Sequence, residues 1–146
     1  MTRADFWCRV LGGIELLGAI GFAAIIMLLW KLVLEIFQID DIPGISYLLW
    51  LFIFFAVTPV FLTGLFTVIF ANAVEQARKG LRDEGRVLLR VFMGLSGLWA
   101  AGVIGMAGLS FPALGLFAVL SLISVGLAVM GPDWTADLIS PEGPRP

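Results

Sequence analysis

The chain has 146 residues, of which 60% are hydrophobic and 14% are charged, with a formal net charge of −2. Soluble domains carry about 25% charged residues, so this composition excludes an ordinary soluble domain. Two stretches, 42–74 and 91–132, contain no Asp, Glu, Lys or Arg. Apolar runs of about 20 residues can cross a bilayer as helices, and their continuity excludes the alternating pattern of an outer-membrane barrel.

Four membrane-spanning helices are predicted, in chain order at about 10–30, 47–73, 87–109 and 113–130. Trp7 and Trp30 flank the first helix at a spacing that suits aromatic belts at both interfaces. The turn between the last two helices lies within GLSFP, residues 108–112, and is so short that these helices must be antiparallel. The predicted fold class is therefore all-α, a polytopic membrane protein with four transmembrane helices in two antiparallel hairpins.

Further expectations concern the two ends of the chain and the segment after the first helix. The first apolar run is longer than the apolar region of a signal peptide, so we expect it to be retained as a helix. Residues 31–44 then either continue that helix or lie along the membrane interface. The four-helix domain is expected to occupy residues 1–131. Residues 132–146 hold four of the seven prolines, and we expect them to form a disordered cytoplasmic tail.

Basic residues indicate the orientation, because those near the ends of spans stay in the cytoplasm. The connection 75–90 contains five of them: Arg78, Lys79, Arg82, Arg86 and Arg90. With four spans, both termini lie on the side of this connection, which collects eight of the nine basic residues and leaves Lys31 outside. The predicted location is the cytoplasmic (cell) membrane, with cytoplasmic N- and C-termini. The same basic connection could contact anionic lipid, but the topology signal is the preferred interpretation.

Enzymatic chemistry is not expected from this composition. The chain has no histidine and a single cysteine, Cys8, so the commonest metal ligand, the commonest general base and a thiolate metal site are missing. The glycines form no phosphate-binding motif. We therefore predict no catalytic, cofactor-binding or metal site and no nucleic-acid partner.

Small residues provide the strongest packing pattern. They fall within an arc of about 80° on the third predicted helix, at 100° per residue, and predict a packing face: Gly94, Gly97, Ala101, Gly105 and Gly108. The fourth predicted helix carries a looser stripe of the same kind: Ala118, Ser121, Ser124, Ala128 and Gly131. In the second, Pro59 predicts a kink whose freed backbone groups are satisfied by nearby threonines; a transport hinge is the less favoured alternative.

Glu15 is the most informative single residue, because an ionisable group inside a membrane segment is costly and marks a candidate functional site. It shares an arc with Gly12, Ala19 and Ala23. In the preferred interpretation Glu15 is structural and forms an intramembrane ion pair with Arg90, at a similar depth on the third helix, or with Arg86 one turn earlier. In the alternative, Glu15 is an unpaired proton site.

These observations predict a small integral membrane protein with a structural or accessory role, as a subunit of a membrane complex. The alternative is a small proton-coupled transporter with Glu15 as its coupling site. A pore is a weaker third interpretation, because no polar stripe spans the full depth of the bilayer. The expected partners are the lipid bilayer and either a second copy of the chain or another membrane subunit. No cofactor is expected.

Overall fold

The computed structural model describes residues 3–37, 43–80, 87–109 and 112–139, and over these residues the protein is helical apart from short turns. The helices are α1 (Arg3–Phe37), α2 (Pro43–Arg78), α3 (Val87–Gly108) and α4 (Pro112–Ile139). Each of the four is long and apolar enough to cross a membrane. The prediction of an all-α chain with four such helices is confirmed.

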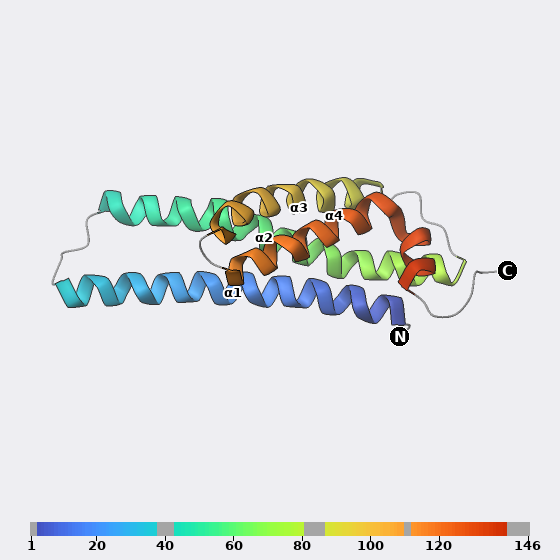
Figure 1. The fold of residues 1–146 in the computed structure, drawn as a ribbon, viewed down its shortest axis with the longest axis horizontal. Coiled ribbons are helices and arrows are strands. Elements are labelled where there is room, and N and C mark those ends of the chain that lie inside the picture. The colour runs from blue at the N-terminus through green and yellow to red at the C-terminus, as the bar shows by residue number, and fades with distance from the viewer. Residues whose placement is uncertain (1–2, 38–42, 81–86, 110–111, 140–146) are drawn as a thin grey trace.

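The helices form one elongated bundle. α1 packs along α2, α3 packs along α4, and α2 also contacts both α3 and α4. Figure 1 shows the start of α1, the end of α2, the start of α3 and the end of α4 at one end of the molecule. At the opposite end α1 and α2 continue well past α3 and α4 (Figure 1). At 1.5 Å per residue, the 35 residues of α1 extend about 52 Å and the 22 of α3 about 33 Å.

The helix ends follow local backbone chemistry. Pro43 and Pro112 are the first residues of α2 and α4, where a missing backbone N–H has no helical partner to lose. After α2, Gly80 adopts a φ of 80° and its N–H donates to the carbonyl of Ala77 at 3.0 Å. A residue in this left-handed conformation ends a helix, and glycine adopts it without steric cost.

Within α1 and α2 the structure extends the predicted spans. α1 begins at Arg3 and runs without interruption to Phe37, so the residues just after Trp30 continue the helix. α2 passes through Pro59 as a single helix. The hydroxyl of Thr63 donates to the carbonyl of Pro59, and that of Thr67 donates to the carbonyl of Thr63, each at 2.7 Å.

The predicted disordered tail is wrong for residues 132–139, which are helical. α4 breaks at Gly131, whose φ of 85° and ψ of 168° are not helical, and resumes with Pro132. In this second part Thr135 and Ala136 are buried, so the segment folds back onto the bundle. The proline count was a poor guide because the first of those prolines starts a helical turn. Residues 140–146, the rest of the expected tail, lie outside the described part.

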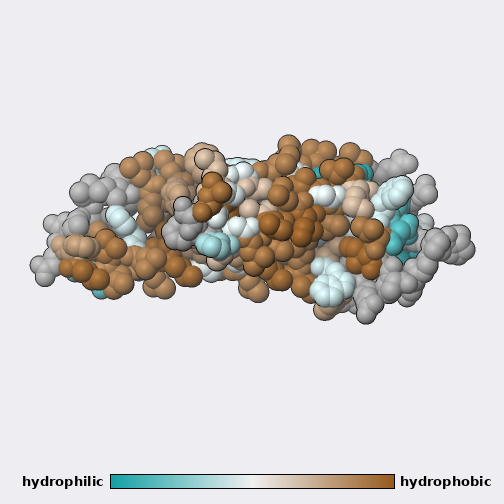
Figure 2. Space-filling model, viewed as in Figure 1, coloured by the Kyte–Doolittle hydropathy of each residue, from teal (hydrophilic) through white to brown (hydrophobic). Residues whose placement is uncertain are grey.

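Two buried apolar clusters make up the core. One lies toward the chain termini: Cys8, Phe70, Ala71, Ala73, Val74, Met93, Leu127, Ala128 and Ala136. The other lies toward the opposite end: Ala19, Ile53, Val57, Val60, Ala100, Ile104 and Ala118. The outer surface is also apolar, as Figure 2 shows for one face, with its strongest hydrophilic colour near the end that holds the start of α1 and the end of α2. Bulky apolar side chains that point outward suit a bilayer rather than water.

Candidate functional site: a buried carboxyl among hydroxyls

Glu15 lies in the interior of the bundle with none of its surface exposed. Ser124 Oγ on α4 is hydrogen-bonded to Glu15 Oε1 at 2.9 Å. The other carboxyl oxygen, Oε2, is buried and has no hydrogen-bond partner among the described residues. The carboxyl group is therefore only half satisfied, which is unusual for a buried polar group.

A chain of hydroxyl groups continues from Glu15 into α2. Thr67 Oγ1 lies 3.2 Å from Ser124 Oγ and hydrogen-bonds to the carbonyl of Thr63 at 2.7 Å. Thr63, Thr67 and Ser124 are all completely buried. The site thus joins α1, α4 and α2 through polar atoms at a level between the two apolar clusters.

Close contact between α1 and α2 brings Glu15 to this position. A methyl group added to Gly12 would lie 2.7 Å from the carbonyl oxygen of Gly64, and one added to Gly64 would lie 2.8 Å from the carbonyl oxygen of Gly12. The same added methyl on Gly64 would lie 3.0 Å from Glu15 Cβ. Two facing glycines therefore let the helix backbones approach, as small residues do in membrane helix pairs.

Ser121 adds a second unsatisfied group. It lies three residues before Ser124, on the same face of α4, and is fully buried. Its Oγ has no hydrogen-bond partner within the described ranges. Both serines belong to the small-residue stripe predicted for the fourth helix, and all five members of that stripe are buried.

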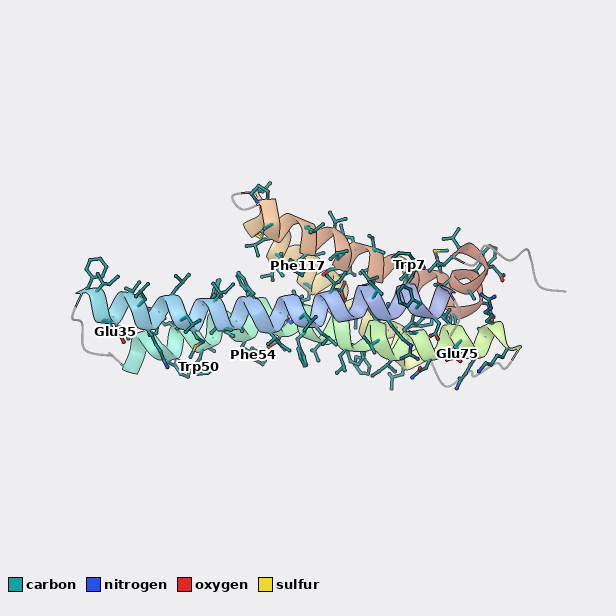
Figure 3. All side chains as sticks on the ribbon, turned by 90° about the horizontal axis from the view of Figure 1, so that it is seen from below. Trp7, Glu35, Trp50, Phe54, Glu75 and Phe117 are labelled. Atoms are coloured by element: carbon teal, nitrogen blue, oxygen red, sulfur yellow. The ribbon has the colours of Figure 1, made fainter. Side chains whose placement is uncertain are left out.

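An apolar cavity lies beyond the site, toward the end where α3 and α4 meet. Its volume is about 440 Å³, and residues of all four helices line it: Phe22, Phe52, Ala56, Val103, Ile104, Ala113 and Leu114. A smaller cavity of about 30 Å³ shares four of these residues and reaches Gly18 and Ala19, one turn from Glu15. The ring of Phe117 packs directly against Gly18. Figure 3 shows Phe117 on α4, which diverges from α1 and α2 toward its start.

The predicted ion pair between Glu15 and Arg90 is not formed. Arg90 Nε donates to the carbonyl of Ala128 at 2.8 Å, and one terminal nitrogen donates to the carbonyl of Val129 at 2.9 Å. These two carbonyl groups have no partner within the helix because α4 breaks at Gly131. The planar guanidinium group of Arg90 can donate to both of them at once. Arg86, the other predicted partner, lies outside the described residues.

The predicted packing stripe on α3 has close neighbours at some positions and none at others. A methyl group on Gly97 would lie 2.5 Å from Val125 and 3.1 Å from the carbonyl oxygen of Ser121, and one on Gly108 would lie 2.8 Å from Gly115. Gly105 has ordinary contact, with Ala118 3.9 Å away, whereas Gly94 has nothing within 4 Å. Ala101 is partly exposed and its neighbour Ala100 is fully buried. The packing face is therefore rotated away from Gly94 and Ala101.

Charged groups gather where α1 begins and α2 ends. Arg9 lies 3.4 Å from Asp5 and 4.0 Å from Glu75, and it hydrogen-bonds to the side chain of Asn72. Lys79 pairs with Glu75 at 2.9 Å. Partly exposed ion pairs of this kind contribute little stability, but they suit a membrane–water boundary. The labelled Glu75 marks this end in Figure 3.

Sequence reasoning selected Glu15 but missed its partners. The sequence pattern predicts Ser124 only as a small packing residue, and the threonines near Pro59 only as local partners for the backbone. The available signal was that two serines, three residues apart, lie on the buried stripe of a membrane helix, where hydroxyls commonly bond across helices. Within the described chain, no group of three or more His, Cys, Asp or Glu side chains is arranged to hold a metal ion.

No family profile, no curated protein and no solved structure matches this chain.

Proposed function

We propose that this protein is a small multi-pass component of the cytoplasmic membrane with a structural or accessory role, built as two antiparallel hairpins with both termini in the cytoplasm. The observation that carries the proposal is the length of α1. From Val10 to Trp30 this helix rises about 30 Å, which matches the hydrocarbon core of a bilayer. It continues to Phe37.

The continuation of α1 beyond Trp30 supports a partner outside the chain. Four bulky apolar residues of this continuation are exposed: Leu32, Val33, Ile36 and Phe37. Tyr47 and Trp50 at the start of α2 are also exposed. Apolar side chains that neither this bundle nor the hydrocarbon core covers favour contact with another membrane subunit.

A photoreactive amino acid at Ile36 tests this proposal in intact cells. We expect irradiation to join the chain to a defined protein partner. The matched control is Leu17, which is also exposed on α1 but lies at the depth of the acyl chains. Protein adducts at neither position, or equally at both, would contradict an accessory role that uses this surface.

A second candidate function is a small proton-coupled transporter that uses Glu15. The observation in its favour is the smaller apolar cavity, of about 30 Å³, which lies one helical turn from the buried carboxyl group of Glu15, whose Oε2 has no partner among the described residues. In proteoliposomes with an internal pH-sensitive dye, Glu15→Gln is expected to abolish proton-driven flux while the fold is retained. Flux that is unchanged in this variant would exclude Glu15 as the coupling site.

A further inference from the structure

The hydrogen bonds around Glu15 can be counted, because each serine or threonine hydroxyl carries a single hydrogen. Three contacts are in sequence: Glu15 Oε1 to Ser124 Oγ at 2.9 Å, Ser124 Oγ to Thr67 Oγ1 at 3.2 Å, and Thr67 Oγ1 to the carbonyl oxygen of Thr63 at 2.7 Å. Ser124 and Thr67 together bring two hydrogens to these three contacts. One of the three contacts therefore receives no hydrogen from these two residues.

The directions of these bonds can be assigned starting from the carbonyl oxygen of Thr63. The carbonyl oxygen of Thr63 can only accept, so the 2.7 Å contact uses the hydrogen of Thr67. Ser124 donates its hydrogen to Glu15 Oε1 at 2.9 Å, so the longer contact of 3.2 Å between the two hydroxyls is left without one. Oε1 of Glu15 therefore has a donor, whereas Oε2 has no partner among the described residues.

The surroundings of Glu15 also disfavour a negative charge. Among the described residues, Ser124 of α4 contacts the carboxyl group through its hydroxyl, and Gly64 of α2 packs close to Glu15 Cβ. Among the described basic residues, Arg9 is engaged by Asp5 and Asn72, and Arg90 by carbonyls of α4. A buried carboxylate without a cation, and with one oxygen unpartnered, is strongly unfavourable.

We infer that Glu15 and Ser124 form a buried proton-binding site, in which Glu15 is a neutral acid that carries its proton on Oε2 and accepts a hydrogen bond from Ser124 at Oε1. Loss of the proton would leave a buried carboxylate with a single donor and no paired cation among the described residues. The site therefore links protonation of Glu15 on α1 to the contact between α1 and α4. This inference does not depend on the accessory role, and a missing partner at Ile36 would leave it intact.

Infrared spectroscopy of the full-length protein in lipid nanodiscs tests the inference directly. At neutral pH we expect a carbonyl stretch of a protonated carboxylic acid that disappears in Glu15→Gln. In Ser124→Ala the band should remain and move to higher frequency, because the C=O group of the acid loses the hydrogen bond that Ser124 donates to it. The matched control is Glu35→Gln, which removes an exposed carboxyl from the same helix and should leave the band unchanged.

Thermal unfolding supplies the second measurement. Glutamine has the shape of the neutral acid, and its carbonyl oxygen can also accept from Ser124, so Glu15→Gln should melt within error of the wild type. Glu15→Ala removes the acceptor and should melt several degrees lower. An absent acid band, a band that survives in Glu15→Gln, or a Gln variant that melts as low as the Ala variant would overturn the inference.

Discussion

Gly12 and Gly13 are consecutive on α1, yet an added methyl group would meet different surroundings at the two positions. At Gly12 it would lie 2.6 Å from a methyl of Val68 and 2.8 Å from that residue's backbone nitrogen. At Gly13 there is nothing within 4 Å. Backbone atoms of α2 cannot move aside without separating the two helices. The absence of a side chain at Gly12 therefore determines how closely α1 can approach α2.

Replacing Gly12 by alanine is therefore expected to destabilise the fold by about 1–3 kcal/mol, the usual range for overpacking. Gly13→Ala is the matched control and should cause no loss, since its methyl group has open space. Thermal unfolding of both variants in the same detergent, followed by circular dichroism, measures the difference. Equal melting temperatures would show that the contact between α1 and α2 does not depend on Gly12.

At the scale of elements, the break in α4 determines where Arg90 is used. Gly131 has a φ of 85° and a ψ of 168°, a region that is essentially restricted to glycine. The break leaves the carbonyl groups of Ala128 and Val129 without helical partners, and Arg90 of α3 donates hydrogen bonds to both. Arg90 therefore holds the start of α3 against α4 just before its break. The same contact explains why this cation is unavailable to Glu15.

Arg90→Leu is expected to lower stability by about 1–3 kcal/mol, because two charge-assisted hydrogen bonds in a partly buried site are lost. Arg90→Lys should recover only part of this loss, because an ammonium group lacks the planar fork. Hydrogen exchange of residues 132–139 should speed up in the Leu variant. Wild-type exchange and melting in that variant would show that Arg90 does not hold this part of α4.

The face that α3 presents to α4 provides a second comparison between elements. Gly97→Leu is expected to cost about 1–3 kcal/mol through overpacking against Val125 and the backbone of Ser121. Gly94→Leu, on the same helix and of the same size, should be tolerated because Gly94 faces open space. Thermal melts compare the two. Equal loss in both variants would mean that the packing face includes Gly94 after all.

At the scale of the whole molecule, the arrangement of the helices and the distribution of charge agree. The start of α1, the end of α2 and the start of α3 lie at one end. Arg9 belongs to α1 and Arg90 to α3, and Lys79 follows directly after α2. The apolar outer surface extends from this end along the four helices. From this distribution we propose that the bundle crosses the bilayer with this end in the cytoplasm.

Reporter fusions test this topology. A fusion at Pro146 is expected to report a cytoplasmic location, and one near Asp41 the opposite side, because basic residues resist translocation. A protein with four crossings requires opposite signals at the two positions. Matching signals would exclude four crossings.

Composition and hydropathy are sufficient to predict four helices, because charge-free runs of this length have few alternatives to an apolar helix. The stripe on the fourth helix is buried throughout, and so are Gly12, Glu15 and Ala19 of the predicted arc on the first, whose fourth member, Ala23, is half-buried. These properties depend on each segment alone. The partners of Glu15 and Arg90 depend instead on contacts between segments: the glycine contact of α1 with α2, and the break at Gly131 that creates acceptors for Arg90. Helical periodicity indicates which residues share a face, but the rotation and depth at which two faces meet are decided by packing.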